Sequence, residues 1–414
     1  MTGWRVGRRA DAPSRQPLPR GFAALWVAVV VDLVGFGMVL PILPLYARRF
    51  GATPLQAALL VAAFSGASLL AAPLWGRVSD RVGRKPVLVV ALLGTAAGGL
   101  LTGLAGGLAL LFVARLLDGA SGGSISVARA AAADMAPPHE RARLFGYLGA
   151  AFGIGFVAGP VIGGIATIAG PRVPFLLAGG IASINALAVA WRLPRPVRPT
   201  PTPHGQTAGG RSGLGAPVVA VIAAAFSSMV AFSAFEATFA LFGHHRLGLA
   251  LGSAAGVFAG IGLVLVVVQG GLVRPVIARI GERRALYAGL GLDAVGLAVL
   301  GSSHTWALAG PALVVLAAGE GLVQTTLSLL VANLANPARR GQALGFQQAA
   351  GSTARVIGPA MGGALLGASG SGLPFLAGSI LSAIAVVAAR LSLPRSRSTA
   401  QDVQITPLGT DTSA

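Results

Sequence analysis

The sequence contains no cysteine, which excludes disulfide bonds and any metal site built from thiolates. Charged residues are also scarce, at 10% of the 414 residues, whereas a soluble domain has about 25%. No phosphate-binding Gly-Lys-Ser/Thr loop, nucleophile elbow or metal-ligand spacing occurs in the chain. These absences predict a protein that is not an enzyme, does not use ATP directly, and carries no cofactor or metal.

Apolar residues dominate what is present. Hydrophobic residues make up 54% of the chain and the mean hydropathy is +0.77, which is typical of a protein that crosses a membrane many times. The first apolar segment contains Asp32 and lacks a small-residue cleavage site, so we interpret it as a span and not as a signal peptide. The sequence therefore predicts an all-α membrane protein with twelve transmembrane helices, over residues 22–46, 55–75, 86–105, 107–129, 142–168, 172–191, 217–243, 253–273, 285–303, 305–332, 342–368 and 373–391.

Basic residues are distributed very unevenly between the two sides of these spans. Of the 31 Lys and Arg, 24 fall on the side that holds both tails, and four fall on the opposite side. Basic loops are retained in the cytoplasm, so both termini are expected there, in the plasma or inner membrane. The net charge of +19 thus reflects topology, and the expected environment is a lipid bilayer with no nucleic-acid partner.

A Pro- and Gly-rich stretch divides the chain into two similar halves. We predict a basic tail at 1–21, six spans at 22–192, a flexible linker at 193–216, six spans at 217–391 and a tail at 392–414. The pattern Gly-Pro-x-x-Gly-Gly that starts at Gly159 recurs at Gly358, 199 residues later. Such a repeat indicates pseudo-twofold symmetry about the membrane normal, and a transporter built this way binds its substrate between the halves near the midplane.

The loop at 76–85 carries one acid among four bases and follows the second span. It resembles the signature loop of the major facilitator superfamily, G-x-x-x-D-R-x-G-R-[KR]. The resemblance implies a gating role in the inward/outward equilibrium, and it implies that Asp134, at the end of span 4, pairs with Arg84. The alternative is a solvated loop that only sets topology. The residues assigned to gating are Gly76, Asp80, Arg81, Gly83, Arg84, Lys85 and Asp134.

Spans 4 and 5 carry two further patterns. Arg115 resembles the arginine of the family's span-4 motif, R-x-x-x-G, which implies a role in proton coupling for it and for Asp118. The two residues are three apart on a helix and can also pair for purely structural reasons. Span 5 resembles the antiporter motif of exporters in the superfamily, although close helix packing alone would explain its small residues. The motif residues are Gly149, Gly153, Gly159, Pro160, Gly163 and Gly164.

Acidic residues inside the spans are candidates for proton coupling, because an ionisable group in the membrane is costly and usually functional. Asp32 lies ten residues into span 1, about 15 Å along the helix, and resembles the span-1 acid of tetracycline and multidrug proton antiporters. A structural hydrogen bond to a neighbouring helix is its alternative. Glu236 lies near Phe232 and Phe235, a combination that suits a lipophilic cation. Its alternatives are a proton-only site or an inter-helix hydrogen bond.

Other polar residues within spans are less specific. Gln324 and Gln347 are candidate hydrogen-bonding groups for substrate, although such residues more often join helices. The roles of Asp293, Glu320 and Arg355 stay open. Span 3 has no acidic residue, unlike the tetracycline exporters that carry one there, so tetracycline itself is a doubtful substrate.

The four patterns extend from Asp32 to about Gly363 and cover nearly the whole chain. The resemblance implies a twelve-span major facilitator of the drug:proton antiporter branch. Such a protein exports small lipophilic drugs by alternating access, with the proton gradient as driving force and a monomer as the functional unit. The alternative is a narrow exporter of a metabolite or sugar. Which of Asp32 and Glu236 titrates, and what the substrate is, stay open.

Overall fold

A computed structural model describes residues 18–194, 215–336, 339–369 and 372–392. The predicted tails and linker lie largely outside these ranges. The N-terminal half consists of α1 (Phe22–Val39), α2 (Leu43–Arg48), α3 (Pro54–Val82), α4 (Arg84–Gly103), α5 (Leu108–Ser121), α6 (Ser124–Met135), α7 (Pro138–Ala166) and α8 (Val173–Arg192). The C-terminal half consists of α9 (Ala216–Leu247), α10 (Leu251–Val267), α11 (Val273–Ile280), α12 (Glu282–Ser302), α13 (Trp306–Leu334), α14 (Arg340–Ser369) and α15 (Leu373–Ser392).

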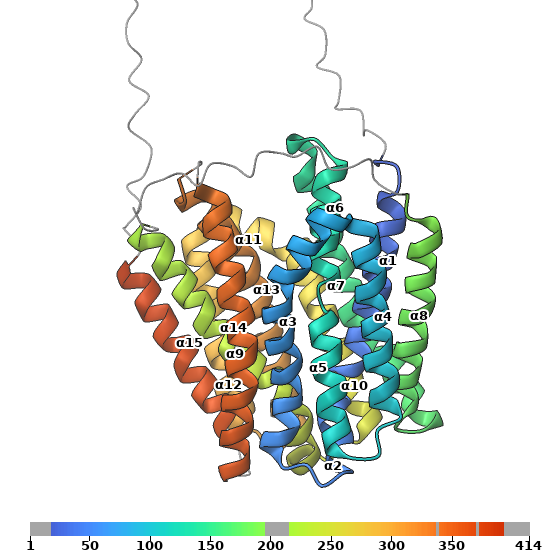
Figure 1. The fold of residues 1–414 in the computed structure, drawn as a ribbon. Coiled ribbons are helices and arrows are strands. Elements are labelled where there is room, and N and C mark those ends of the chain that lie inside the picture. Colours follow the sequence, from blue (N-terminus) through green and yellow to red (C-terminus); the bar gives the residue numbers. More distant parts are fainter. Residues whose placement is uncertain (1–17, 195–214, 337–338, 370–371, 393–414) are drawn as a thin grey trace, which may run out of the picture.

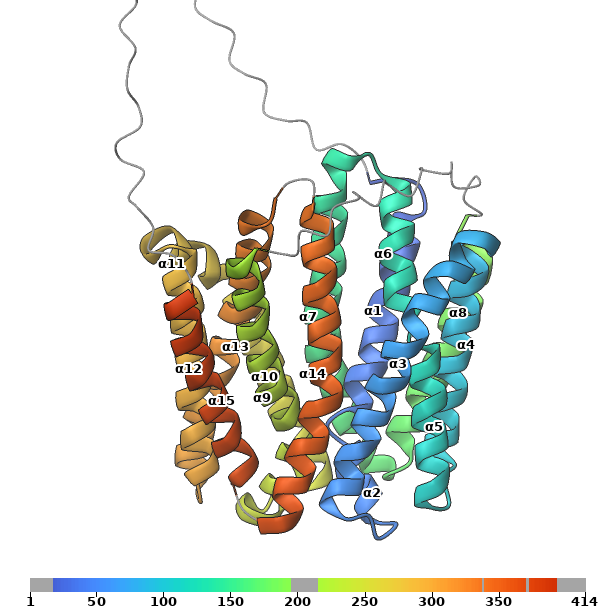
Figure 2. The ribbon, with the colours of Figure 1, turned by 60° about the vertical axis from the view of Figure 1, so that its left-hand side comes forward.

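The two halves stand side by side, with their helices running roughly parallel to one axis (Figure 1). We call the end where α1 begins and α15 ends the basic end, and the opposite end the α2 end. In Figure 2 the blue-to-green N-terminal half lies beside the yellow-to-red C-terminal half. The all-helical fold predicted from the sequence is therefore confirmed.

Within the described ranges, eleven of the twelve predicted spans are long and apolar enough to cross a membrane. The twelfth, α14, has 30 residues, which gives about 45 Å of helix, but its first half is more polar than the other spans. Gln347, Gln348 and Arg355 all lie on it. A helix of this kind is stable in a membrane when its polar side faces protein or water and not lipid.

Three predicted spans are interrupted where the backbone loses a regular hydrogen bond. The first ends at Val39 and resumes at Leu43 as α2, because Pro41 lacks an amide proton. The fourth is divided into α5 and α6 at Gly122 and Gly123. In the eighth, a π-helical turn at Val268–Leu272 separates α10 from α11, and such turns mark local irregularities within helices.

The predicted loop at 76–85 is wrong in its extent. Helix α3 continues to Val82 and α4 begins at Arg84, so only Gly83 separates them. Charged side chains do not end a helix that emerges into water. The helix ends instead at Gly83, whose φ of +100° is a conformation that costs glycine little. Gly281 does the same between α11 and α12, with φ +79°. Gly76 lies inside α3 and takes no part in the reversal.

The antiporter-motif glycines of α7 join α7 to a helix of each half. A Cβ added at Gly159 would lie 2.6 Å from the Val34 carbonyl oxygen of α1, and one at Gly163 would lie 3.0 Å from Met38. On the side facing the other half, a Cβ at Gly164 would lie 3.1 Å from Ala255 of α10. Pro160 lies within the same helix. Glycine is needed at these points because the backbones approach too closely for a side chain.

The same contacts recur in α14 with the halves exchanged. Gly358 faces the backbone of Val230 and Ala234 on α9, its own half, while Gly363 faces Ala58 on α3 of the other half. Ala58 and Ala255 are separated by 197 residues and occupy equivalent places. Two reciprocal contacts, α7 with α10 and α14 with α3, therefore link the halves, as pseudo-twofold symmetry requires.

The halves pack together at the α2 end and not at the basic end. Among the described residues, the buried cluster around Ile42 and Tyr46 includes Leu241 and Leu366 from the other half. The clusters nearer the basic end each draw their residues from one half. Glycines follow the same trend, since a Cβ at Gly149 would meet no atom within 4 Å. Buried apolar residues therefore join the two halves at the α2 end, while the clusters nearer the basic end each stabilise a single half.

Candidate functional site

Asp32 lies in the middle of α1 and contacts α6, which is the second helix of the interrupted fourth span. Its Oδ2 accepts a hydrogen bond of 2.7 Å from the Ser124 hydroxyl. Ser124 is the first residue of α6 and is buried, while Asp32 itself is half-buried. The inter-helix bond fits a structural aspartate, and the remaining exposure leaves the carboxylate able to exchange a proton. The geometry is compatible with both interpretations given for Asp32.

Arg115 and Asp118 form an ion pair inside the N-terminal half. Arg115 Nη1 lies 3.0 Å from Asp118 Oδ2, and Arg115 Nη2 donates a 3.0 Å hydrogen bond to the Thr102 hydroxyl. The two residues are 3% and 7% exposed. Arg115 Nε has no hydrogen-bond partner among the described residues. The predicted i,i+3 pair is thus present, and it is buried deeply enough that loss of either member leaves an uncompensated charge.

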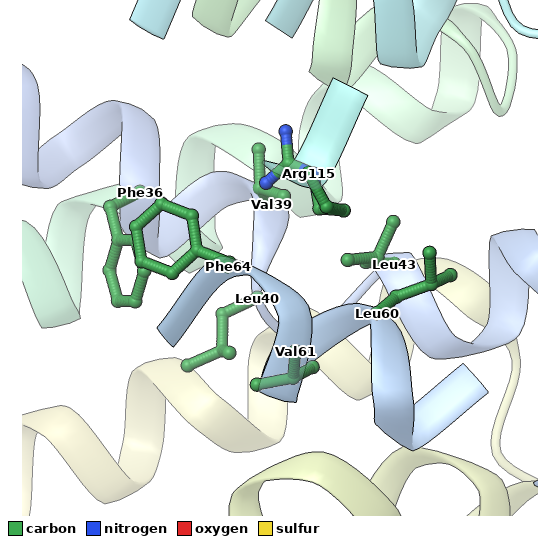
Figure 3. A pocket seen from close by; sticks show the side chains of 8 residues that line it. All are labelled: Phe36, Val39, Leu40, Leu43, Leu60, Val61, Phe64 and Arg115. Carbon is green, nitrogen blue, oxygen red and sulfur yellow. The ribbon is translucent and has the colours of Figure 1, made fainter. Parts of the chain in front are cut away.

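A small cavity borders this arginine (Figure 3). Apolar side chains line it, and the Arg115 guanidinium lies beside Val39 at its edge. Its volume is about 20 Å³, close to that needed for one water molecule and far below the several hundred Å³ of a drug site. The lining residues are Phe36, Val39, Leu40, Leu43, Leu60, Val61, Phe64 and Arg115. This cavity is therefore too small to be the substrate site.

Glu236 is buried on α9, at 9% exposure. The described residues provide electrostatic neighbours for its carboxylate, Arg355 and Glu320, but no hydrogen bond. Phe232 and Phe235 pack into the core of the C-terminal half, at 6% and 0% exposure. Both rings therefore lie inside the core of their own half in this conformation, which does not support the predicted aromatic substrate site.

The two glutamines proposed for substrate binding are both engaged by protein groups. Gln324 Nε2 donates a 2.7 Å hydrogen bond to Glu320 Oε1 on the same helix. Gln347 Nε2 donates a 3.1 Å bond to the Ser328 hydroxyl, which joins α14 to α13. These contacts match the alternative interpretation, in which the amides hold helices and side chains in place.

Arg84 connects three helices at the basic end. Its Nη1 lies 2.6 Å from Asp80 Oδ1 on α3, and its Nε lies 2.8 Å from Asp134 Oδ2 on α6. Nη1 also donates a 2.6 Å bond to the Ser79 hydroxyl, which is fully buried. The expected pairing of Arg84 with Asp134 is therefore present, and Asp80 joins it. All of these residues belong to the N-terminal half, so in this conformation the network fixes α3, α4 and α6 to one another.

The rest of the signature segment faces outward. Arg81 is exposed and Lys85 is half-buried. A Cβ added at Gly76 would meet no atom within 4 Å. These residues are available for contacts that form only when the basic end closes, and their gating role stays a prediction.

The crossing of α4 over α5 has a counterpart at α12 and α13. A Cβ at Gly98 would contact the Ala114 carbonyl oxygen and Asp118, and one at Gly296 would contact the Ala312 carbonyl oxygen and Leu316. The numbers differ by 198 in each case. By the same offset, the buried Arg115 and Asp118 are replaced in the C-terminal half by Leu313 and Leu316, while Asp293 replaces Thr95.

Sequence reasoning missed the hydroxyl groups of this protein. Ser124, Thr102, Ser79 and Ser228 each bond to a charged side chain. Serine and threonine are common in transmembrane helices, and which side chain each one meets depends on helix rotation and crossing. Identifying them would have required knowing how each helix is rotated relative to its neighbours, which one sequence does not provide.

Comparison with known proteins identifies the family. The sequence model of the Major Facilitator Superfamily matches residues 25–335 and 273–408. The chain belongs to the Major Facilitator Superfamily. It is 30% identical to the class C tetracycline resistance protein of Escherichia coli, over 87% of this chain and 94% of that protein. It is 28% identical to multidrug resistance protein 2 of Bacillus subtilis (strain 168), over 83% and 88% of the two chains.

Solved structures of this superfamily share the fold. A bacterial homologue of the human lysosomal transporter Spinster, in an inward-facing and occupied conformation, superposes with a TM-score of 0.74 at 15% identity, covering 90% of this chain and 96% of that one. The human organic anion transporter TETRAN gives 0.68 at 23% identity, covering 91% and 100%. This chain is thus a multi-pass membrane protein with the architecture of a transporter, and its relatives place it in the drug:proton antiporter branch.

Proposed function

We propose that this major facilitator exports small lipophilic drugs from the cell in exchange for protons. The observation that carries the proposal is Asp32, a carboxylate in the middle of α1 that is half-buried and bonded to Ser124 at 2.7 Å. An acid at this depth is costly unless it serves transport. The chain that carries this acid is 30% identical, over 87% of its length, to a tetracycline resistance protein.

The basic end faces the cytoplasm in this proposal, since basic loops are retained there. Substrate then enters between the halves from the cytoplasm or the inner leaflet of the plasma membrane. Substrate, protons and lipid are the partners, and one chain supplies both halves, so a monomer suffices. The proton gradient drives the cycle without a cofactor.

Alternating access follows from the way the halves are joined. The close contacts of Gly164 with α10 and of Gly363 with α3 hold the two halves together at the α2 end. For the cycle to proceed, these contacts loosen as α3 and α14, or α7 and α10, approach one another at the basic end. Gly149 and Gly76 have open space beside them, which leaves room for that approach. The Arg84 network keeps α3, α4 and α6 together, so that the N-terminal half moves as a unit.

Proton coupling is assigned to Asp32, with Glu236 as the second candidate. A charged Asp32 attracts a cationic drug from the cytoplasmic side. When the site opens outward and Asp32 takes up a proton, that attraction is lost and the drug leaves. Return to the inward-facing state and loss of the proton restore the carboxylate. Glu236 could act similarly in the C-terminal half, where the positive charge of Arg355 interacts with its carboxylate.

The test uses inside-out vesicles that contain this protein and are energised by respiration. Ethidium, a fluoroquinolone, chloramphenicol, tetracycline and several sugars are added in turn, and collapse of the pH gradient is recorded. Lipophilic drugs are expected to collapse the gradient, and Asp32→Asn to abolish the response. Glu282→Gln, which changes a carboxylate at the basic end of α12, is the matched control and should respond as wild type.

Other outcomes would overturn the proposal. A response to a single sugar and to no drug, from protein shown to be inserted and folded, would indicate a narrow exporter. Tetracycline is the least expected substrate, because α4 carries no acidic residue. Full activity of Asp32→Asn would remove the assignment of proton coupling to Asp32.

A further inference from the structure

The α2 end of the protein carries positive charge and no acidic residue. The chain at this end comprises residues 40–53, 104–107, 167–172, 244–250, 303–305 and 370–372. None of these segments contains an Asp or a Glu, and together they contain four arginines and three histidines, namely Arg48, Arg49, Arg172, Arg246, His244, His245 and His304. A cation at this end therefore has no carboxylate beside it in the loops, and an anion that pairs with it comes from outside the chain.

Arg246 lies in the last turn of α9 and is half-buried. Its Nη1 lies 3.5 Å from the Ser303 carbonyl oxygen and 3.4 Å from His304 Nε2, in the turn between α12 and α13. Its guanidinium carbon lies 5.6 Å from the centre of the Phe242 ring. Both hydrogen bonds are long and both use Nη1, whereas a guanidinium has five N–H donors. The described residues therefore leave most of these donors available to a further ligand.

His304 presents a second donor beside this guanidinium. Because arginine can only donate, His304 Nε2 accepts the hydrogen bond from Arg246. The neutral imidazole then carries its proton on Nδ1, and the side chain is exposed. A charged donor and a neutral donor thus lie next to each other, which is a combination that suits the oxygens of a phosphate group.

Trp306 indicates the depth of this corner in the membrane. Its Nε1 donates a 3.0 Å hydrogen bond to the Leu247 carbonyl oxygen, so the first residue of α13 is joined to the last residue of α9. The side chain is nevertheless 42% exposed. Tryptophans at the ends of spans lie at the level of the lipid headgroups. Arg246 is adjacent to Leu247 in the chain, so its guanidinium lies near the level of the lipid phosphates.

Beyond Trp306, α13 presents an apolar stripe outside the protein core. Leu308, Pro311 and Val314 are exposed and follow one another at intervals of three residues, which places them on one side of the helix. On a membrane-spanning helix such a stripe is in contact with acyl chains. The corner therefore combines donors for a phosphate with an apolar surface that runs from them into the bilayer.

The matching turn of the N-terminal half lacks this arrangement. At the offset of 198 residues that relates α12 and α13 to α4 and α5, Gly106, Gly107 and Leu108 stand in place of His304, Thr305 and Trp306. That turn has neither an imidazole nor an indole. The N-terminal half also provides a control residue, because Arg172 is an exposed arginine of the α2 end, at the start of α8.

We propose that Arg246 and His304, with Trp306 beside them, bind the headgroup of an anionic phospholipid. The guanidinium and the Nδ1–H of His304 donate to the phosphate oxygens, and the acyl chains lie along the stripe of α13. An anionic lipid is favoured over a zwitterionic one, because the α2 end offers no carboxylate to a headgroup ammonium. The site goes beyond the proposed transport function, and in the orientation proposed above it lies in the outer leaflet.

The test measures quenching of Trp306 fluorescence by brominated lipids in reconstituted vesicles. The parent protein is the full chain with the other four tryptophans replaced by phenylalanine. Brominated phosphatidylglycerol or brominated phosphatidylcholine is added in increasing proportion to unbrominated phosphatidylcholine. One arginine near a membrane surface gives about a fivefold preference for an anionic lipid. We therefore expect half-maximal quenching at a mole fraction of phosphatidylglycerol about five times lower than that of phosphatidylcholine.

Two variants of the parent protein locate the preference. Arg246→Gln should bring the two quenching curves together. Arg172→Gln removes the same charge from the same end and should leave the curves apart. Equal quenching by both lipids in the parent protein would overturn the proposal. An equal loss of preference in the two variants would also overturn it, because the overall charge of the α2 end would then attract anionic lipid without a site at Arg246.

A measurement with the native tryptophans covers the case in which the parent protein does not fold. Delipidated protein in a mild detergent is mixed with equal amounts of phosphatidylglycerol and phosphatidylcholine, and native mass spectrometry counts the lipids retained. Arg246→Gln is expected to retain one phosphatidylglycerol fewer than wild type, and Arg172→Gln as many as wild type. The same retention by all three proteins would contradict the proposal. Loss of that lipid in millimolar inorganic phosphate would mean that the site binds free phosphate and not a lipid. Neither measurement uses a drug or a proton gradient, so a failure of the proposed export leaves the result unaffected.

Discussion

The ion pair of Arg115 and Asp118 allows its structural and functional roles to be separated. Both residues are almost fully buried, and the arginine also donates a hydrogen bond to the Thr102 hydroxyl. The Asp118→Leu variant therefore leaves a charged guanidinium without its counter-ion. Removing one member of a buried pair costs about 3–5 kcal/mol. A cost of about 4 kcal/mol lowers the ratio of folded to unfolded protein about a thousandfold.

The double variant Arg115→Leu with Asp118→Leu should behave differently. The C-terminal half carries Leu313 and Leu316 at the equivalent positions, so this helix crossing accommodates two leucines. Replacing both members of a buried pair by apolar residues is neutral or stabilises by about 1–4 kcal/mol in other proteins. We expect the double variant to regain most of the stability that the single variant loses.

The free energy of unfolding is measured in mixed micelles of a mild detergent and dodecyl sulfate. A double variant as unstable as Asp118→Leu, or a single variant as stable as wild type, would refute the reasoning. Transport by the stable double variant then decides the function of the pair. Drug-dependent proton exchange at the wild-type rate means a structural pair, and its loss in folded protein means that the pair takes part in coupling.

Glycine packing, the Arg84 network and the Gly83 reversal give three more tests. Gly159→Ala places a Cβ 2.6 Å from a carbonyl oxygen and should destabilise the folded protein by about 1–3 kcal/mol. In Gly149→Ala the added Cβ meets no atom, and the folded protein should be more stable by up to about 1 kcal/mol. Equal thermal stability of the two variants would contradict the packing. Arg84→Lys keeps the charge but not the simultaneous contact with Asp80 and Asp134. We expect the free energy of unfolding to fall by about 1 kcal/mol at low salt and by less at high salt, as measured by thermal unfolding at the two salt concentrations. Gly83→Ala forces an alanine to φ +100° and should lose about 1–2 kcal/mol, while Gly76→Ala on the adjoining helix should not.

Much of the architecture follows from the order of residues along the chain. Membrane-spanning helices satisfy their own backbone hydrogen bonds, so hydropathy alone indicates their number and approximate positions. The repeat at Gly159 and Gly358 predicts the equivalence of α7 and α14, because glycines at helical spacing are needed where backbones meet. Pairing of Arg84 with Asp134 was expected from a family pattern, and the ion pair is present.

Helix boundaries and side-chain partners were less predictable. Charges at 76–85 looked like a loop, yet the helix continues to Val82, since water outside the membrane solvates charged side chains on a helix as well as on a loop. Phe232 and Phe235 looked like a drug site beside Glu236, yet both face the core of their own half. Residues one turn apart can face different neighbours, and the sequence does not state the rotation of each helix.

The sequence by itself determined the class of the protein, its two-fold repeat and the presence of acids in the membrane, because the free-energy cost of placing polar groups in lipid is a local property of each segment. Only the tertiary structure decided which acids are paired. Asp118 pairs with an arginine, Asp32 accepts a hydrogen bond from Ser124, Asp293 accepts one from Ser228, and Glu320 accepts one from Gln324. Those pairings depend on how the helices cross and rotate, and they determine where this transporter can hold charge inside the membrane.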